Sequence, residues 1–187
     1  LATCRRHGVD VLFAPSEAEM YPQPAATFVA VDGLTERLCG AFRPGYFRGV
    51  TTVVAKLLNI VAPDRAYFGE KDYQQLVVIR RMVEDMNMPV EIVGVETVRE
   101  PDGLALSSRN DNLTAKQRAA ALTISRTLEL VRRSIASGET ETAALKELAE
   151  RKFDVEPLLR LEYFEVIDPE TLQPVEQIAG PVRIAVA

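Results

Sequence analysis

The sequence predicts an α/β fold with a parallel sheet, followed by a smaller α+β unit. Short apolar stretches alternate with amphipathic helix patterns up to residue 95, which is the order of crossover connections between parallel strands. After residue 110 two helix patterns are followed by extended segments with no helix between them. The 187 residues are 47% hydrophobic, enough to form one large core or two small ones.

The first half begins with the end of a helix, Leu1–Gly8, which a glycine closes. Valine and leucine then recur at helical spacing from Val50, and this pattern predicts a helix that Pro63 ends. The other elements expected before it are a strand over Val9–Phe13, an extended piece over Thr27–Val31, at most one helical turn over Leu34–Leu38, and a glycine-hinged loop over Arg43–Gly49.

A strand, a turn, a helix and a strand come next. We predict a strand over Arg65–Phe68, a turn over Gly69–Asp72, a helix from Tyr73 to about Asn87, and a strand over Val90–Val95. Buried parallel strands have this short and mostly apolar character. The first half is therefore α/β.

The second half starts with a capping box, Thr114–Gln117, whose side chains satisfy the free amides at the beginning of a helix. This helix should run to about Ser137. A second helix over Glu141–Lys152 and extended segments over Leu161–Ile167 and Val182–Val186 follow. We therefore expect three regions: an α/β domain portion over 1–98, a hinge over 99–112, and a small α+β domain over 113–187.

Charge and composition exclude several classes of protein. Lys and Arg number 22 against 27 Asp and Glu, a net charge of −5 that disfavours a nucleic-acid or anionic-membrane partner. No apolar run approaches the roughly 20 residues of a membrane span, so we expect a soluble protein. Cys4 and Cys39 are too few for a disulfide scaffold and indicate a cytoplasmic location. With His7 as the only histidine, we expect no metal site and no catalytic triad.

The sharpest candidate site is the segment Tyr67–Leu76, where a parallel strand ends and a helix begins. Open α/β sheets bind ligands at this position, and helix N-termini attract phosphate. Gly69 lets a ligand approach the backbone, Lys71 supplies a point charge for a phosphate, and Gln75 can orient a polar substrate. The alternative is a solvated turn in which Glu70 pairs weakly with Lys71.

A second candidate is the loop Asp102–Asn110, which follows the last parallel strand. Its two adjacent serines and Arg109 form a compact group of anion donors, and its Asp-Gly pair predicts a tight turn. The alternative is an inter-domain linker rich in turn-forming residues. The sequence contains neither GxxxxGK[ST] nor GxGxxG, so this is not a P-loop or dinucleotide-binding loop.

The segments Phe68–Leu76, Asp102–Asn110 and Arg43–Val50 together resemble the pantothenate synthetases, also called pantoate–β-alanine ligases. The resemblance covers nearly the whole chain. It implies a Rossmann-like domain of the HIGH/KMSKS-type nucleotidyltransferase superfamily and a smaller C-terminal domain. It also implies an AMP-forming ligase in which pantoate attacks the α-phosphorus of Mg-ATP to form pantoyl adenylate, and β-alanine then displaces AMP. The family also implies a homodimer.

The resemblance carries site residues over to matching positions. Gly69, Glu70, Lys71 and Asp72 match an ATP-binding GEKD segment, and Gln75 matches a glutamine that contacts pantoate. The backbone of Val98 matches a contact to adenine. The stretch from Leu106 through Ser107 and Ser108 to Arg109 corresponds to the KMSKS loop. The resemblance implies catalytic roles for Lys71, which would stabilise charge, and for Ser107 and Ser108, which would hold pyrophosphate.

Two positions depart from the family pattern. The family's HxGH turn is not found around His7, so we expect it to precede Leu1 and expect this chain to be inactive alone. Tyr46 stands where many members have histidine. Two alternatives to the ligase therefore stay open: a non-catalytic nucleotide-binding module, and an adenylyltransferase with another acceptor, which Gln75 and the Gly69–Leu76 string disfavour.

Overall fold

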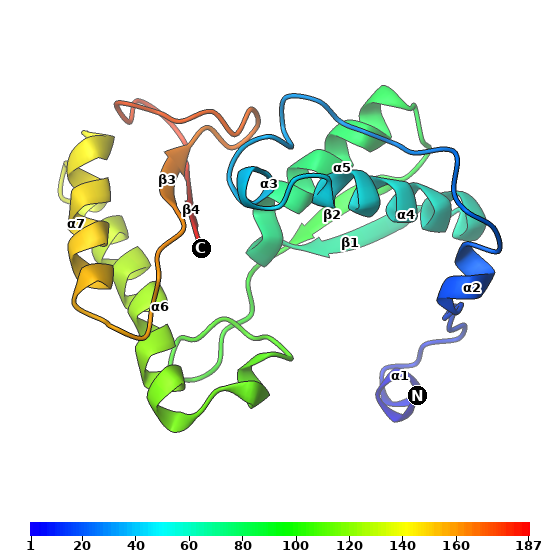
Figure 1. The fold of residues 1–187 in the computed structure, drawn as a ribbon, viewed down its shortest axis with the longest axis horizontal. Coiled ribbons are helices and arrows are strands. Elements are labelled where there is room, and N and C mark those ends of the chain that lie inside the picture. Colours follow the sequence, from blue (N-terminus) through cyan, green and yellow to red (C-terminus); the bar gives the residue numbers. More distant parts are fainter.

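The computed structural model describes residues 1–187, which form two groups of elements lying side by side (Figure 1). None of the helices is both long and apolar enough to cross a membrane. The first group comprises α1 (Ala2–Arg6), α2 (Glu17–Met20), α3 (Cys39–Phe42), α4 (Tyr46–Val61), β1 (Arg65–Gly69), the 3₁₀ turn η1 (Glu70–Asp72), α5 (Tyr73–Asp85) and β2 (Glu91–Val95). After the 3₁₀ turn η2 (Asn110–Asn112), the second group comprises α6 (Ala115–Ala136), α7 (Thr142–Asp154), β3 (Phe164–Ile167) and β4 (Arg183–Val186).

Strands β1 and β2 form a parallel pair, and α5 is the crossover between them. Their register runs from Arg65 opposite Glu91 to Gly69 opposite Val95. Because side chains alternate along a strand, Ala66 and Phe68 of β1 both pack against the first hydrophobic cluster. The predicted order of strand, turn, helix and strand is confirmed, and with it the α/β class.

Helix α4 begins four residues before the predicted start at Val50. Gly45 takes a positive φ of 79° as the N-cap, and Tyr46 starts the helix. Phe47 is only 3% exposed and belongs to the same cluster as Ala55 and Leu58. The prediction of a glycine-hinged loop over Arg43–Gly49 was therefore wrong beyond Gly45, because the buried apolar face of the helix already includes Phe47.

The strand predicted over Val9–Phe13 is absent. A β-strand requires a hydrogen-bonded neighbour, and these residues pair with no other segment. Val11 is 82% exposed and Leu12 is 52% exposed, so the apolar run that suggested a buried strand faces solvent.

The Thr27–Val31 segment is held by side chains in place of a strand ladder. Thr52 Oγ1 accepts from the Val29 amide at 3.0 Å, and Thr51 Oγ1 donates to the Val29 carbonyl at 2.6 Å. Of the at most one helical turn expected over Leu34–Leu38, none forms, and the short helix α3 begins at Cys39.

The second group follows the prediction closely. Thr114 Oγ1 accepts from the Gln117 amide at 3.3 Å, and Gln117 Oε1 accepts from the Thr114 amide at 3.0 Å. This capping box opens α6, which packs against α7. Strands β3 and β4 pair antiparallel. The core here consists of Val131, Leu145, Ala149, Phe153, Phe164 and Val166.

A third apolar cluster joins the two groups. Leu38 and Val77 come from the first group, and Ile167 and Leu172 come from the second. Tyr163 packs against this cluster, and its ring lies 5.8 Å from that of Phe42, centroid to centroid. The two groups are thus held against each other by buried apolar contact as well as by the chain between them.

Gly40 is required by a close backbone approach. A Cβ atom added at Gly40 would lie 1.8 Å from the Thr35 carbonyl oxygen, whereas one added at Gly49 in α4 would meet no atom within 4 Å. We expect Gly40→Ala to lower the free energy of unfolding by on the order of 2–3 kcal/mol through overpacking. We expect Gly49→Ala to raise it by about 1 kcal/mol through helix propensity. Urea unfolding of both variants checks this, and equal stability of the two would contradict the packing at Gly40.

Tyr163 should make the protein sensitive to alkali. Burial disfavours the phenolate and raises the pKa of Tyr163 to about 12, whereas an unfolded tyrosine has a pKa of about 10. The folded state therefore binds this proton more tightly, so its contribution is fully present below pH 10 and is lost as the pH rises toward 12.

We expect Tyr163→Phe to flatten the fall in unfolding free energy between about pH 10 and pH 12. Tyr67→Phe is the matched control, because Tyr67 is 63% exposed, and it should keep the wild-type slope. Denaturant unfolding at several pH values measures this. An unchanged slope in the Tyr163 variant would show that the phenol is not buried as described.

Candidate functional site

The first predicted segment lies at the carboxyl end of the parallel pair. Gly69 is the last residue of β1 and lies opposite Val95, the last residue of β2. Glu70–Asp72 form η1, and Tyr73 begins α5. No side chain caps the amino end of α5. The segment therefore presents a helix N-terminus at the edge of the sheet where open α/β proteins bind ligands.

Lys71 and Gln75 lie on this turn and on the first turn of α5. The Lys71 side chain is 41% exposed, and its Nζ lies 3.9 Å from Asp72 Oδ2. A pair this long and this exposed is weak, so the ammonium is free to meet an anion. A Cβ atom added at Gly69 would meet no atom within 4 Å, so the space over the turn is open.

Glu70 has a different role from the one predicted in a solvated turn. Its Oε2 pairs at 3.3 Å with Nη2 of Arg183, on β4, and not with Lys71. The Arg183 guanidinium also lies 4.2 Å from the centre of the Tyr73 ring. The Tyr73 hydroxyl donates to the Pro169 carbonyl at 3.1 Å. The turn is thus fastened to the C-terminal group by contacts that the sequence pattern did not indicate.

Gln74 fastens the same turn to the N-terminal group. Its Nε2 donates to the carbonyls of Leu34 and Arg37, both at 2.8 Å, and the side chain is buried. The sequence pattern pointed only to the neighbouring Gln75. A glutamine on the apolar face of a helix is the signal that could have identified Gln74, because a buried amide requires partners.

The second predicted segment folds back on itself after β2. The Leu106 amide donates to the Val98 carbonyl at 2.8 Å, which brings the predicted adenine contact beside the start of the KMSKS-like loop. The chain reverses through a turn in which the Gly103 amide donates to the Glu100 carbonyl at 2.8 Å. Gly103 has a φ of 93°, the conformation that the Asp-Gly pair predicted.

Beyond this turn, hydrogen bonds to Ser107 order the backbone of the loop, and the side chains of Ser108 and Arg109 remain unpaired. The Arg109 amide donates to Ser107 Oγ at 3.2 Å, and the Asn110 amide donates to the Ser107 carbonyl at 3.0 Å. The side chains of Ser108 and Arg109 are exposed and form no hydrogen bond or ion pair. A hydroxyl and a guanidinium are therefore available to an anion.

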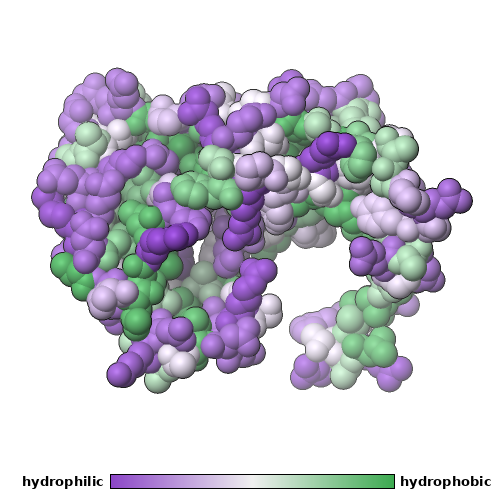
Figure 2. All heavy atoms as spheres, in the orientation of Figure 1, coloured by the Kyte–Doolittle hydropathy of each residue, from purple (hydrophilic) through white to green (hydrophobic).

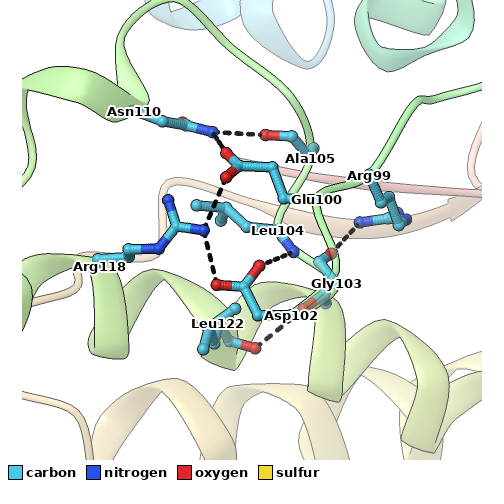
Figure 3. A network of polar contacts seen from close by, with 10 residues as sticks. Arg99, Glu100, Asp102, Gly103, Leu104, Ala105, Asn110, Arg118 and Leu122 are labelled. Atoms are coloured by element: carbon cyan, nitrogen blue, oxygen red, sulfur yellow. Dashed lines mark hydrogen bonds and ion pairs between the residues drawn. The ribbon is translucent and has the colours of Figure 1, made fainter.

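A polar network ties this loop to α6 (Figure 3). Arg118 Nη2 donates to Glu100 Oε2 at 2.8 Å and to Asp102 Oδ2 at 2.6 Å. Asn110 Nδ2 donates to Glu100 Oε1 at 2.6 Å and to the Ala105 carbonyl at 2.9 Å. Hydrogen bonds from Arg118 hold the pKa of both Glu100 and Asp102 below the usual range. Both carboxylates are therefore ionised at neutral pH.

The two segments follow adjacent strand ends but do not bond to each other. No hydrogen bond or ion pair joins Gly69–Gln75 to Val98–Arg109. Figure 2 shows an open hollow between the N-terminal segment and the rest of the molecule, bordered by hydrophilic side chains on the side of the C-terminal group.

A surface depression of about 340 Å³ elsewhere contains none of the predicted site residues. It lies on α6 and the end of α7, and its lining is Thr123, Arg126, Thr127, Leu130, Lys152 and Val155. We place the candidate site at the strand ends, because that is where a helix N-terminus and the exposed ammonium of Lys71 lie, and because the loop with the unpaired Arg109 follows the second strand.

Comparison with known proteins identifies the family. The family model described as pantoate-beta-alanine ligase matches residues 1–187. Pantothenate synthetases from Moorella thermoacetica and Heliobacterium modesticaldum are each 57% identical over 180 residues. These 180 residues are 96% of this chain and 64% of each relative, so the chain spans slightly less than two thirds of their length.

Solved structures that are similar to this chain point to the same family. The crystal structure of pantothenate synthetase from Thermus thermophilus matches with a TM-score of 0.95 and 48% identity, over 99% of this chain and 67% of that one. Pantoate-beta-alanine ligase from Francisella tularensis, complexed with beta-gamma ATP and beta-alanine, matches with a TM-score of 0.72 and 34% identity, over 89% of this chain and 60% of that one. This chain therefore belongs to the pantoate–β-alanine ligase family.

Proposed function

We propose that this chain is the part of an ATP-dependent ligase that holds the nucleotide and pantoate while pantoate is joined to β-alanine. The observation that carries the proposal is that the GEKD turn and the KMSKS-like loop follow the carboxyl ends of two paired parallel strands. Family membership supports the reaction, and the Francisella relative was solved with a β,γ nucleotide and β-alanine.

The reaction proceeds in two steps. A pantoate carboxylate oxygen attacks the α-phosphorus of ATP, and the bond from that phosphorus to the pyrophosphate oxygen breaks. The amine of β-alanine then attacks the acyl carbon, loses a proton, and AMP leaves with the electron pair of the broken acyl–oxygen bond. The first step requires no general base, because pantoate is already ionised at neutral pH. The protein must position the reactants and balance the charge that develops on the phosphates.

Different residues of the candidate site position the reactants and balance the charge on the phosphates. Lys71 places its ammonium beside the phosphates, and Ser107, Ser108 and Arg109 hold the departing pyrophosphate. Gly69, Glu70 and Asp72 shape the turn around ATP, and Gln75 orients pantoate. The backbone of Val98 and Leu106 receives the adenine side of the nucleotide, and the Val98 amide forms no hydrogen bond within the protein.

Magnesium enters this proposal with the nucleotide. No three His, Cys, Asp or Glu side chains gather in the structure. Mg²⁺ commonly binds through substrate phosphates together with one or two carboxylates. We therefore treat MgATP as the substrate and assign no metal ligands in this chain.

The proposed function also divides the chain. Residues 1–98 form the ATP- and pantoate-binding portion, 99–112 the hinge that carries the KMSKS-like loop, and 113–187 the small C-terminal domain. The separate apolar clusters on either side of 99–112 support this division. We further propose that the full-length protein is a cytoplasmic homodimer, and the two free cysteines fit a reducing compartment.

Lys71→Ala tests the proposal in the full-length gene product. Loss of one preorganised charge at a reacting phosphate lowers turnover by about 100-fold or more, so we expect pantoate-dependent ATP–pyrophosphate exchange to fall by that factor. Lys116→Ala is the matched control, because Lys116 is exposed and unpaired in the first turn of α6. It should leave the exchange unchanged.

A loss of less than about tenfold in the Lys71 variant would remove its assigned role. Absence of any pantoate-dependent exchange in the wild-type full-length protein, together with ATP binding measured by calorimetry, would instead indicate a nucleotide-binding module. Exchange driven by other acids and not by pantoate would indicate an adenylyltransferase with a different acceptor.

A further inference from the structure

We infer that Arg118 is a positioning residue for the KMSKS-like loop: it fixes the loop to helix α6 without itself contacting substrate. This inference rests on the proposed function for the identity of the loop. The geometry that supports it is independent of that identity (Figure 3).

Arg118 holds the N-terminal end of the loop through two ion pairs. A single nitrogen, Nη2, donates to Glu100 at 2.8 Å and to Asp102 at 2.6 Å, and these carboxylates flank the turn that reverses the chain. Two carboxylates this near to each other repel. The positive guanidinium between them offsets that repulsion and bridges the two carboxylates through charge-assisted hydrogen bonds.

Asn110 extends the same network to the other end of the loop. Its amide nitrogen donates to the second oxygen of Glu100 at 2.6 Å and to the Ala105 carbonyl at 2.9 Å. Glu100 is thus shared between Arg118 and Asn110, and Glu100 and Asn110 flank Leu106–Arg109 in the sequence. The Glu100 carboxylate therefore connects the two ends of the phosphate loop, and Arg118 connects this carboxylate to α6.

The side chains of this network are partly buried, so solvent screens their ion pairs less than those on the open surface. The side chains of Glu100, Arg118 and Asp102 are 24%, 33% and 35% exposed, whereas the Glu129–Arg132 ion pair, also on α6, has side chains 40% and 69% exposed. Ser108 and Arg109 form no side-chain hydrogen bond or ion pair, and Ser107 Oγ accepts only from the Arg109 amide within the loop. The position of these three residues therefore depends on where α6 holds the loop.

The experiment compares Arg118→Ala with Arg132→Ala in the full-length gene product. Arg132 lies on the same helix and pairs only with Glu129, so it controls for the loss of a surface arginine. In Arg118→Ala we expect backbone amides of residues 100–110 to exchange hydrogen about tenfold faster or more, with unchanged exchange in α7.

Kinetics give the second measurement. We expect kcat/KM for ATP to fall about tenfold or more in Arg118→Ala, while the KM for pantoate changes less than about threefold, because Gln75 lies outside the network. Arg118→Lys should recover part of the loss, since its ammonium keeps the charge and several donors but lies on a shorter side chain. A general loss of stability would instead affect both substrates alike.

The inference is overturned if Arg118→Ala matches Arg132→Ala both in exchange over residues 100–110 and in kcat/KM for ATP. If Arg118→Ala does not fold, Asp102→Ala removes one acceptor of the bridge and should shift both readouts in the same direction, and an unchanged result would overturn the inference equally. If the wild-type protein has no pantoate-dependent activity, the proposed function fails. Hydrogen exchange still decides whether Arg118 anchors the loop.

Discussion

Burial of helix α5 on two sides is the constraint on which the rest of the structure depends. Val78, Ile79 and Met82 are almost fully buried in the cluster shared with α4. Val77, on a neighbouring face of the same helix, belongs to the cluster shared with the C-terminal group. A helix held on two faces cannot rotate without opening an apolar core. Its amino end, and the GEKD turn that precedes it, are therefore fixed relative to both groups.

The two halves of the candidate site are positioned by different means. The first segment is held by the buried Gln74 amide on one side and by the contact of Arg183 with Glu70 on the other. The second segment is held by charge, through Arg118 and the carboxylates beside the turn. The buried faces of α5 add apolar packing to these polar contacts of the first segment. An ion-pair joint is more easily opened than a packed core, which suits the proposed role of the second segment in receiving a nucleotide and releasing pyrophosphate.

Local sequence patterns predicted the elements whose hydrogen bonds and apolar faces are local. The strand and turn at Arg65–Asp72 and the capping box at Thr114 depend on residues a few positions apart, and both are confirmed. The strand predicted at Val9–Phe13 is absent because a strand also needs a neighbour, which no local pattern reveals. The Arg118 network escaped prediction for the same reason, since its partners lie 16 and 18 residues away and meet only in the folded chain.

We propose that one nucleotide contacts both segments at once, the GEKD turn and the KMSKS-like loop. Hydrogen exchange of the full-length gene product with and without MgATP measures this. We expect residues 69–75 and 98–109 to become protected together, at the same nucleotide concentration. Protection of only one segment, or protection confined to the depression at α6 and α7, would contradict it.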